Sequence, residues 1–220
     1  ENVERQQQFI ANASHEIKTP LAVLSANTDL LAMMGTEAKF VDSNKRQIKR
    51  LNSLVEQMLI LSRYDEGEAA ATKEEVDLVA VTKAIVEEIL PVLNEKGLQV
   101  EFTGEAQTIV TTNKSAMTEL IRILLDNAMK YTVDEPVITV EAKRNQLAIG
   151  NETEPMTKEQ VSQIFDRFYR VDSSRNRTTG GSGLGLSIAK KIAETNNVQL
   201  TAELPSETRI RFVIEGEKNG

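Results

Sequence analysis

The first third of the chain carries apolar side chains in a seven-residue repeat. In residues 3–34 the repeat falls on Ile10, Ile17 and Leu24, and a second run of the same kind occupies residues 38–63. This spacing predicts two helices, because it places the apolar side chains along one face of each. Only a short turn separates the helices, so they are expected to form an antiparallel hairpin.

The apolar faces of this predicted hairpin are too extensive to be covered by the hairpin itself. Two copies that pair into a four-helix bundle would bury them, which predicts a homodimer. The alternative is that the faces pack against the remainder of the same chain. The repeat runs through both helices, as the seams of a bundle do, and therefore favours the dimer.

The pattern changes beyond residue 63. Residues 64–75 are polar and lack an apolar stripe, which predicts a linker, so a hairpin domain is assigned to residues 1–66 and a second domain to residues 67–220. The second domain mixes strand-like alternation with helical spacing. Helices are expected at 79–95, 114–131 and 183–196, and strands at 98–103, 107–111, 136–143, 146–150, 199–203 and 208–214.

The strands expected in the second domain follow one another in adjacent pairs. Such pairs predict a mixed, largely antiparallel sheet with helices on one face, which is an α/β sandwich. The predicted fold class is therefore α+β, a helical hairpin followed by an α/β sandwich.

Composition narrows the range of functions. The chain has no Cys, which excludes disulfides and thiolate chemistry, and it has no uncharged apolar run long enough to span a membrane. Residues 1–63 hold 8 Lys and Arg against 7 Asp and Glu, which leaves 18 against 26 in the remainder. The second domain is therefore acidic, and this argues against nucleic acid as its ligand.

The first predicted helix carries the only histidine, His15, beside a seam position. A neutral imidazole at such a position is nucleophilic near neutral pH. Glu16 can hydrogen-bond one ring nitrogen and leave the other free to attack. Thr19 lies one turn further along on the same face, where its hydroxyl can position a water molecule. The alternative is an ordinary solvated histidine, against which the surrounding motif counts.

Glycines gather at the expected start of the helix 183–196. Gly181, Gly183 and Gly185 let the backbone approach a phosphate, and the helix N-terminus near Leu184 supplies free N–H groups. The usual P-loop is excluded, because Gly-Lys-Ser/Thr is missing. The flanking residues 171–182 have almost no apolar anchor and are expected to form a mobile loop.

A further group of polar residues lies on the expected helix 114–131. Asn127 and Lys130 are three residues apart and share a face, and Tyr131 follows them. The amide oxygen of Asn127, together with nucleotide phosphates, would suit Mg²⁺, which takes few protein ligands. Lys130 could neutralise phosphate charge, and Arg170 could reach a transferring phosphate from beside the loop. Taken alone, Asn127 and Lys130 are more typical of a solvated helix end than of a nucleotide site.

These segments, in this order, resemble the sensor histidine kinases of bacterial two-component systems. The motifs are Phe9–Leu21, similar to the phosphoacceptor box, Leu124–Thr132, similar to the N box, Phe165–Asp172, similar to the F box, and Gly181–Leu186, similar to the second glycine box. The resemblance covers essentially the whole chain. It implies a dimerising phosphotransfer hairpin followed by a Bergerat-type ATP-binding domain. The implied reaction moves the γ-phosphate of ATP to a histidine and then to an aspartate of a response regulator.

The resemblance also implies a role for each candidate residue. His15 would be the phosphoacceptor, Glu16 its activating base, and Thr19 the residue that helps water attack a phosphorylated regulator. Asn127 would hold Mg²⁺. The other residues implied to contact ATP are Lys130, Tyr131, Asn151, Arg170, Gly181, Gly183, Leu184 and Gly185.

The sequence departs from this family in the first glycine box, which usually reads Asp-x-Gly-x-Gly-Ile. Here Asn151 replaces the Asp that reads adenine, and Thr153 and Pro155 replace the two glycines. An amide oxygen can still accept a hydrogen bond from the adenine amino group. A second departure is Ile123, where the N box often has another Asn. An active kinase with altered nucleotide affinity is expected, and a weakly active or phosphatase-dominant enzyme is the second choice.

Two other functions compete with the kinase. A gyrase-like or chaperone-like ATPase would keep the nucleotide site but would not need Ser14-His15-Glu16 on a dimerising hairpin. A non-catalytic dimer that binds nucleotide as a switch is supported by the altered glycine box. The resemblance further implies a response regulator receiver domain as partner, and a cytoplasmic location next to a membrane-anchored sensory region that this sequence does not contain.

Overall fold

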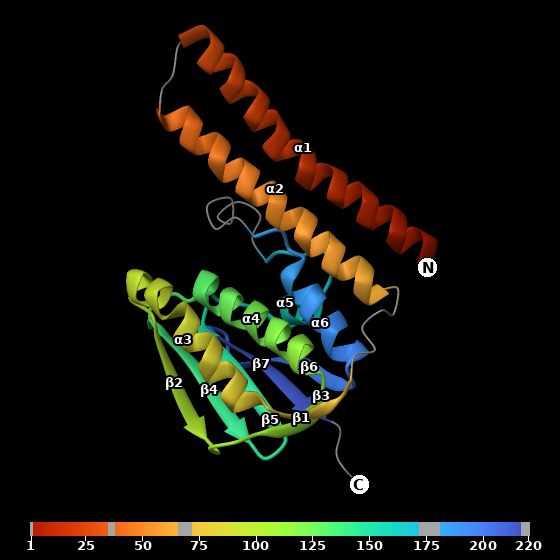
Figure 1. Ribbon diagram of the computed structural model, residues 1–220, viewed down its shortest axis with the longest axis vertical. Coiled ribbons are helices and arrows are strands. Elements are labelled where there is room, and N and C mark those ends of the chain that lie inside the picture. The colour runs from red at the N-terminus through yellow and green to blue at the C-terminus, as the bar shows by residue number, and fades with distance from the viewer. Residues whose placement is uncertain (1, 35–37, 66–71, 172–180, 217–220) are drawn as a thin grey trace.

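The computed structural model describes residues 2–34, 38–65, 72–171 and 181–216. They form a long helical hairpin and an α/β domain, the latter comprising the elements from β1 to β7 (Figure 1). The helices are α1 (Asn2–Met34), α2 (Ala38–Asp65), α3 (Leu78–Lys96), α4 (Lys114–Tyr131), α5 (Lys158–Gln163) and α6 (Gly185–Thr195). The strands are β1 (Glu74–Asp77), β2 (Gln99–Gly104), β3 (Ile109–Thr112), β4 (Val137–Lys143), β5 (Gln146–Glu152), β6 (Val198–Ser206) and β7 (Arg209–Gly216).

The main sheet has the strand order β2-β4-β5-β7-β6. Only β2 and β4 are parallel, and the other three neighbouring pairs are antiparallel. Helices α3, α4 and α6 cover one face of this sheet (Figure 1). The predicted fold, a hairpin followed by an α/β sandwich with a mixed and largely antiparallel sheet, is confirmed.

Three local features of the α/β domain differ from the prediction. The end of the predicted linker 64–75 enters strand β1, which pairs with β3 in a separate two-stranded sheet. Strands β2 and β3, which follow each other in sequence, therefore do not pair, and β2 instead lies parallel to β4. The short helix α5 was not predicted at all. Four to six residues are too few to show a clear apolar period, so these elements depend on their tertiary neighbours.

The core of the α/β domain is built from α4 and the covered face of the sheet. Helix α4 starts at Asn113, whose side chain accepts a hydrogen bond from the N–H of Ala116 at 2.8 Å. Leu120 and Leu124, at helical spacing, are fully buried beneath it. Apolar residues on alternate positions of β4 and along β5 complete the core. This packing holds the C-terminal turns of α4 at a defined place above the sheet.

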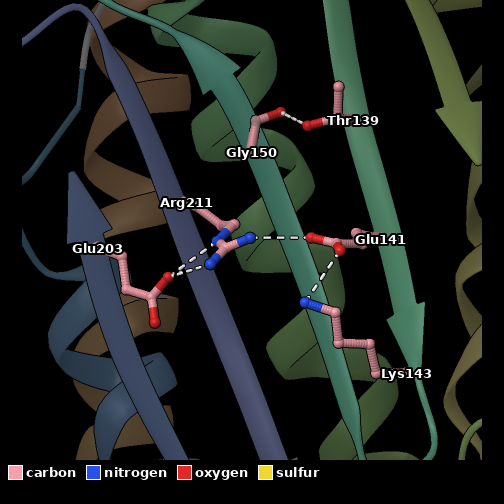
Figure 2. Close-up of polar contacts among 6 residues, drawn as sticks. All are labelled: Thr139, Glu141, Lys143, Gly150, Glu203 and Arg211. Carbon is pink, nitrogen blue, oxygen red and sulfur yellow. Dashed lines mark hydrogen bonds and ion pairs between the residues drawn. The ribbon is translucent and has the colours of Figure 1, made fainter. Parts of the chain in front are cut away.

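The other face of the sheet carries a row of ion pairs across three strands (Figure 2). Arg211 of β7 pairs with Glu203 of β6 and, at 2.8 Å, with Glu141 of β4, which Lys143 also contacts at 3.0 Å. Arg211 can reach β4 because the residue opposite it on the intervening strand is Gly150. The small β5 residue thus allows a direct link between strands that are not neighbours.

The hairpin packs against the α/β domain through α2, which lies between α1 and that domain (Figure 1). Leu54 and Leu61 of α2 are buried in the same apolar cluster as the α/β core. Between the helices, Asn27 donates a hydrogen bond to Asn44 at 2.9 Å. One face of α2 therefore packs against the remainder of the same chain, which is the alternative that the sequence left open beside the dimer. No helix within the described ranges is long and apolar enough to cross a membrane.

Candidate functional site

A cavity of about 500 Å³ opens between α4, the segment after β5, the segment before α6, and α2. The predicted mobile loop 171–182 borders it, although residues 172–180 lie outside the described part of the chain. The lining residues are Gln57, Ile123, Asp126, Asn127, Lys130, Tyr131, Val133, Thr153, Glu154, Pro155, Met156, Gln160, Ile164, Tyr169, Arg170, Val171, Gly181, Ser182, Gly183, Gly185, Leu186 and Ile210.

The C-terminal turns of α4 supply one polar wall of the cavity. Asn127, Lys130 and Tyr131 all line it, as their shared helical face predicts. Lys130 forms an ion pair of 2.5 Å with Asp126 one turn earlier. This wall therefore presents an amide, a hydroxyl and a carboxylate-paired ammonium group to whatever occupies the cavity.

The glycine-rich turn forms the opposite wall, and its geometry explains the glycines. Gly183 has a φ of +77°, and a Cβ there would lie 2.8 Å from the backbone of Phe168. The Phe168 N–H donates to the Gly183 carbonyl at 2.9 Å, so the F-box segment and the turn are joined through their backbones. Gly181 lies against Tyr131, whose hydroxyl would be 3.0 Å from an added Cβ. Side chains at these positions would push the walls apart.

The N-terminus of α6 points its first amides toward this turn. Leu184 is the N-cap residue and makes no side-chain capping bond, while its own side chain is fully buried and anchors the turn. Leu184 itself does not line the cavity, although its neighbours Gly183 and Gly185 do. Uncapped N–H groups and the positive end of a helix dipole favour an anion at this place.

Asn151 lies in β5, is almost completely buried, and does not line the cavity. Its amide nitrogen donates to the Glu152 carbonyl at 2.7 Å, whereas its Oδ1 has no hydrogen-bond partner among the described residues. An unpaired buried acceptor costs about 1–3 kcal/mol, so it is a natural place for a ligand donor. The exocyclic amino group of adenine is a donor of the required kind.

The segment that replaces the first glycine box is held in place without glycines. The N–H groups of Thr153 and Met156 donate to the carbonyls of Thr208 and Glu207, at 2.8 and 2.7 Å. Pro155 between them needs no acceptor because it has no N–H. The segment therefore lines the cavity with side chains where the family usually has bare backbone.

The hairpin residues implied in catalysis all lie on α1. The side chain of His15 is outside the described part of the structure. Glu16 is half-buried and accepts a hydrogen bond from Arg50 of α2 at 2.8 Å, and Thr19 is exposed. Glu16 and Thr19 do not line the cavity, and α2 lies between α1 and the α/β domain (Figure 1).

Several lining residues were not anticipated from the sequence. Gln160 could have been found, because Thr157 and Gln160 form the capping box that starts α5. Asp126 stands next to Asn127 and was overlooked. Gln57 comes from the hairpin and carries no local signal, so only the packing of α2 on the α/β domain reveals it.

Two protein families match this chain. Residues 5–67 match the family described as "His Kinase A (phospho-acceptor) domain", and residues 112–218 match "Histidine kinase-, DNA gyrase B-, and HSP90-like ATPase". The first match covers the hairpin, and the second covers the region from the end of β3 to beyond β7, which includes every lining residue of the cavity except Gln57.

The chain is also similar to sensor kinases over nearly its whole length. It is 31% identical to the sensor histidine kinase YkoH of Bacillus subtilis, over 92% of this chain and 46% of that protein. It is 31% identical to the histidine-protein kinase BaeS of Escherichia coli, over 94% of this chain and 48% of that protein. The chain thus spans about half the length of these curated relatives.

Solved structures support the same fold. The histidine kinase AdeS of Acinetobacter baumannii superposes with a TM-score of 0.74 at 18% identity, over 94% of this chain and 98% of that one. Full-length ShkA in complex with AMPPNP gives a TM-score of 0.61 at 15% identity, over 96% of this chain and 45% of that one. The two domain matches and the 31% identity to YkoH and BaeS show that the chain belongs to the sensor histidine kinases of bacterial two-component systems.

Proposed function

We propose that this chain is an ATP-dependent protein-histidine kinase that phosphorylates His15. The single observation that carries the proposal is the cavity. It joins the Asn127 face of α4 to the glycine-rich N-terminus of α6, on the same chain as a phosphoacceptor hairpin. In the reaction an imidazole nitrogen of His15 attacks the γ-phosphorus, an N–P bond forms, and the bond to the ADP oxygen breaks. The imidazole proton passes to Glu16.

The residues present fit an adenine nucleotide. The unpaired Oδ1 of Asn151 can accept from the adenine amino group, and the uncapped amides of α6 can receive the phosphates. Lys130, Tyr131 and Arg170 line the cavity between these ends and are assigned to phosphate and ribose. Gly181, Gly183 and Gly185 let the backbone approach the ligand, and Leu184 anchors them.

Mg²⁺ is assigned to Asn127. Within the described ranges no three His, Cys, Asp or Glu side chains come together as a metal site. A hard cation in this cavity would therefore take the Asn127 oxygen together with phosphate oxygens and water, as Mg²⁺ commonly does. Its contribution when bound would be to offset the negative charge of the phosphates.

Phosphotransfer requires a rearrangement of the hairpin and the α/β domain. In the arrangement seen here α2 stands between α1 and the cavity, and Arg50 occupies one oxygen of Glu16. The α/β domain must leave α2 before its nucleotide can approach a His15, whether of its own chain or of a partner. The docked arrangement is therefore assigned to a resting state.

The remaining assignments follow the family. The boundary between the phosphotransfer and catalytic domains is placed at residues 66 and 67, two hairpins form a four-helix dimer, and the phosphoryl group passes to an aspartate of a response regulator receiver domain. Thr19 would support water attack on the phosphorylated regulator. The chain is placed in the cytoplasm as part of a membrane-anchored sensor.

Labelling with γ-³²P-ATP and Mg²⁺ tests the proposal. The intact chain should acquire a label that is stable in base and lost in acid, and His15→Gln should acquire none. Thr28→Ala, a change at an exposed position of the same helix, should label like the wild type. Equal labelling of His15→Gln would disprove the assignment of the phosphoacceptor.

A second candidate is a non-catalytic dimer that binds nucleotide as a switch. It is favoured by the segment 153–156, which has Thr153 and Pro155 in place of the two glycines and is held to the turn between β6 and β7 by backbone hydrogen bonds. Tight nucleotide binding without any labelling of His15 would favour this function over the kinase.

A further inference from the structure

Helix α2 contributes a side chain to the wall of the nucleotide cavity. Gln57 lines the cavity although it belongs to the hairpin. Leu54 and Leu61, three residues before it and four after it, are 3% and 2% exposed and join the apolar core. Because these spacings put all three on one face of α2, the two buried leucines hold Gln57 against the cavity.

Gln57 is hydrogen-bonded to the glycine-rich turn. The hydroxyl of Ser182 donates to Oε1 of Gln57, and the same hydroxyl oxygen accepts a bond from the N–H of Leu184 at 3.2 Å. These two bonds connect α2 to the N-terminus of α6. As a result, both the Ser182 proton and the Leu184 amide are used within the protein.

The Ser182 hydroxyl belongs to the part of the cavity best suited to phosphate. A phosphate at a helix N-terminus needs N–H and O–H donors aimed at its oxygens. Ser182 lies between Gly181 and Gly183 in the cavity wall, and Leu184 caps α6. A phosphate that binds Ser182 through its hydroxyl must first displace Gln57.

We propose that Gln57 is a regulatory residue of the nucleotide site, which withholds the Ser182 hydroxyl from phosphate while the hairpin is docked. The inference rests on the proposed function, because it takes the occupant of the cavity to be a nucleotide. Binding of nucleotide and docking of α2 then oppose each other, and by thermodynamic linkage each weakens the other to the same degree. A signal that shifts α2 would change nucleotide affinity without touching the nucleotide.

Calorimetric titration of the full chain with Mg·AMPPNP tests this role. Gln57→Ala and Gln57→Met both remove the acceptor and should tighten binding about two- to tenfold, the worth of one hydrogen bond. Asn52→Ala, which removes an exposed amide from the same helix outside the cavity, should leave the affinity unchanged. Circular dichroism of each variant confirms that α2 remains helical.

A double-mutant cycle separates this role from a purely structural one. Ser182→Ala should weaken binding, and adding Gln57→Ala to it should bring no further change, because the acceptor then has no hydroxyl to withhold. If Gln57→Ala binds as the wild type does, or more weakly, the inference about Gln57 is wrong while the proposed function stands. If the wild type binds no nucleotide at all, the proposed function and the inference fail together.

Discussion

The hairpin and the α/β domain bury their apolar residues to very different extents. In the α/β domain Leu120 and Leu124 are fully buried, whereas in the hairpin Met33 is 82% exposed and Leu21 is 56% exposed. Helix α2 also leaves Ile48, Val55 and Leu59 exposed at spacings of seven and four. The α/β domain forms a closed core within a single chain. The hairpin has an exposed apolar face that can be buried only against another surface.

The difference in burial matches a difference in role between the two regions. A closed core holds α4 and the glycine-rich turn at defined positions around a cavity, which a ligand site requires. The exposed apolar face of the hairpin can pack against different partners, such as the α/β domain in a docked state or a second hairpin in a dimer. The stripe formed by Ile48, Val55 and Leu59 lies on a different part of α2 from Leu54 and Leu61, so a dimer face and a docking face can coexist.

The largest loss of stability is expected when a buried side chain of the α/β core is truncated. Leu120→Ala should reduce the free energy of unfolding by about 2–5 kcal/mol, because a fully buried leucine leaves a cavity when truncated. Leu21→Ala, the matched change at an exposed position of the hairpin, should cost less than about 1 kcal/mol in dilute solution. Urea denaturation followed by circular dichroism measures both. Similar losses for the two variants would contradict the comparison.

The next effect concerns the exposed apolar face of the hairpin. Val55→Asp should weaken the proposed homodimer at least about 100-fold, because it places an unpaired charge in each half of a buried seam. Sedimentation equilibrium measures the dissociation constant. Ile109→Asp alters an apolar residue of the α/β domain with similar exposure, 43% against 48%. That control should dimerise like the wild type, and a Val55→Asp dimer of normal strength would rule out this stripe as the interface.

Asn151 is an exception within the closed region, since its buried Oδ1 lacks a partner among the described residues. Asn151→Asp should tighten ATP binding by about tenfold, because a charged acceptor bonds more strongly than an amide. It should also lower the stability of the ligand-free chain, since a buried carboxylate is costly without a donor. Titration with ATP and a thermal melt measure the two effects. Asn151→Leu, which removes the acceptor, should weaken binding, and unchanged affinity in both variants would show that residue 151 does not contact the ligand.

The smallest effect lies on the open face of the sheet (Figure 2). The hydrogen bond from Lys143, followed by the charges of Lys143 and Arg211, holds the pKa of Glu141 below its usual value. A lowered carboxylate pKa stabilises the fold above the ordinary pKa of the group, and this stabilisation is lost as the pH falls through the folded-state pKa.

Glu141→Gln should therefore cost less than about 1 kcal/mol at neutral pH, as expected for a solvent-accessible ion pair. The difference from the wild type should disappear in strong acid, and it should shrink when about 1 M salt screens the charges. Urea unfolding curves at several pH values measure it. A difference that persists unchanged at low pH would mean that the carboxylate charge is not what stabilises this row.

The sequence predicted the site residues that belong to motifs, but it did not predict the lining residue that comes from the hairpin. Asn127, Lys130, Tyr131 and the glycine turn were found because their spacing on one helix, or before another, places them together locally. Gln57 was missed because no local pattern in α2 marks a residue that meets the α/β domain 125 positions further along.

The sequence by itself determined the elements with a long period or a strong cap. Helix α4 lies at its predicted bounds, 114–131, where its apolar face repeats over five turns and the Asn113 cap fixes its start. The hairpin likewise followed from its seven-residue repeat. Local steric and hydrophobic rules act within each such segment, and they need no knowledge of the remainder of the chain.

Only the tertiary structure decided how these elements meet. The pairing of β1 with β3, the parallel contact of β2 with β4, and the docking of α2 on α6 join residues that are distant in sequence. A four-residue strand has too few alternating apolar and polar positions to specify which strand it pairs with. An amphipathic helix does not specify which of several apolar surfaces it will cover. Strand pairing and helix docking depend on how much apolar surface is buried and on which backbone groups are hydrogen-bonded, and both are properties of the folded chain as a whole.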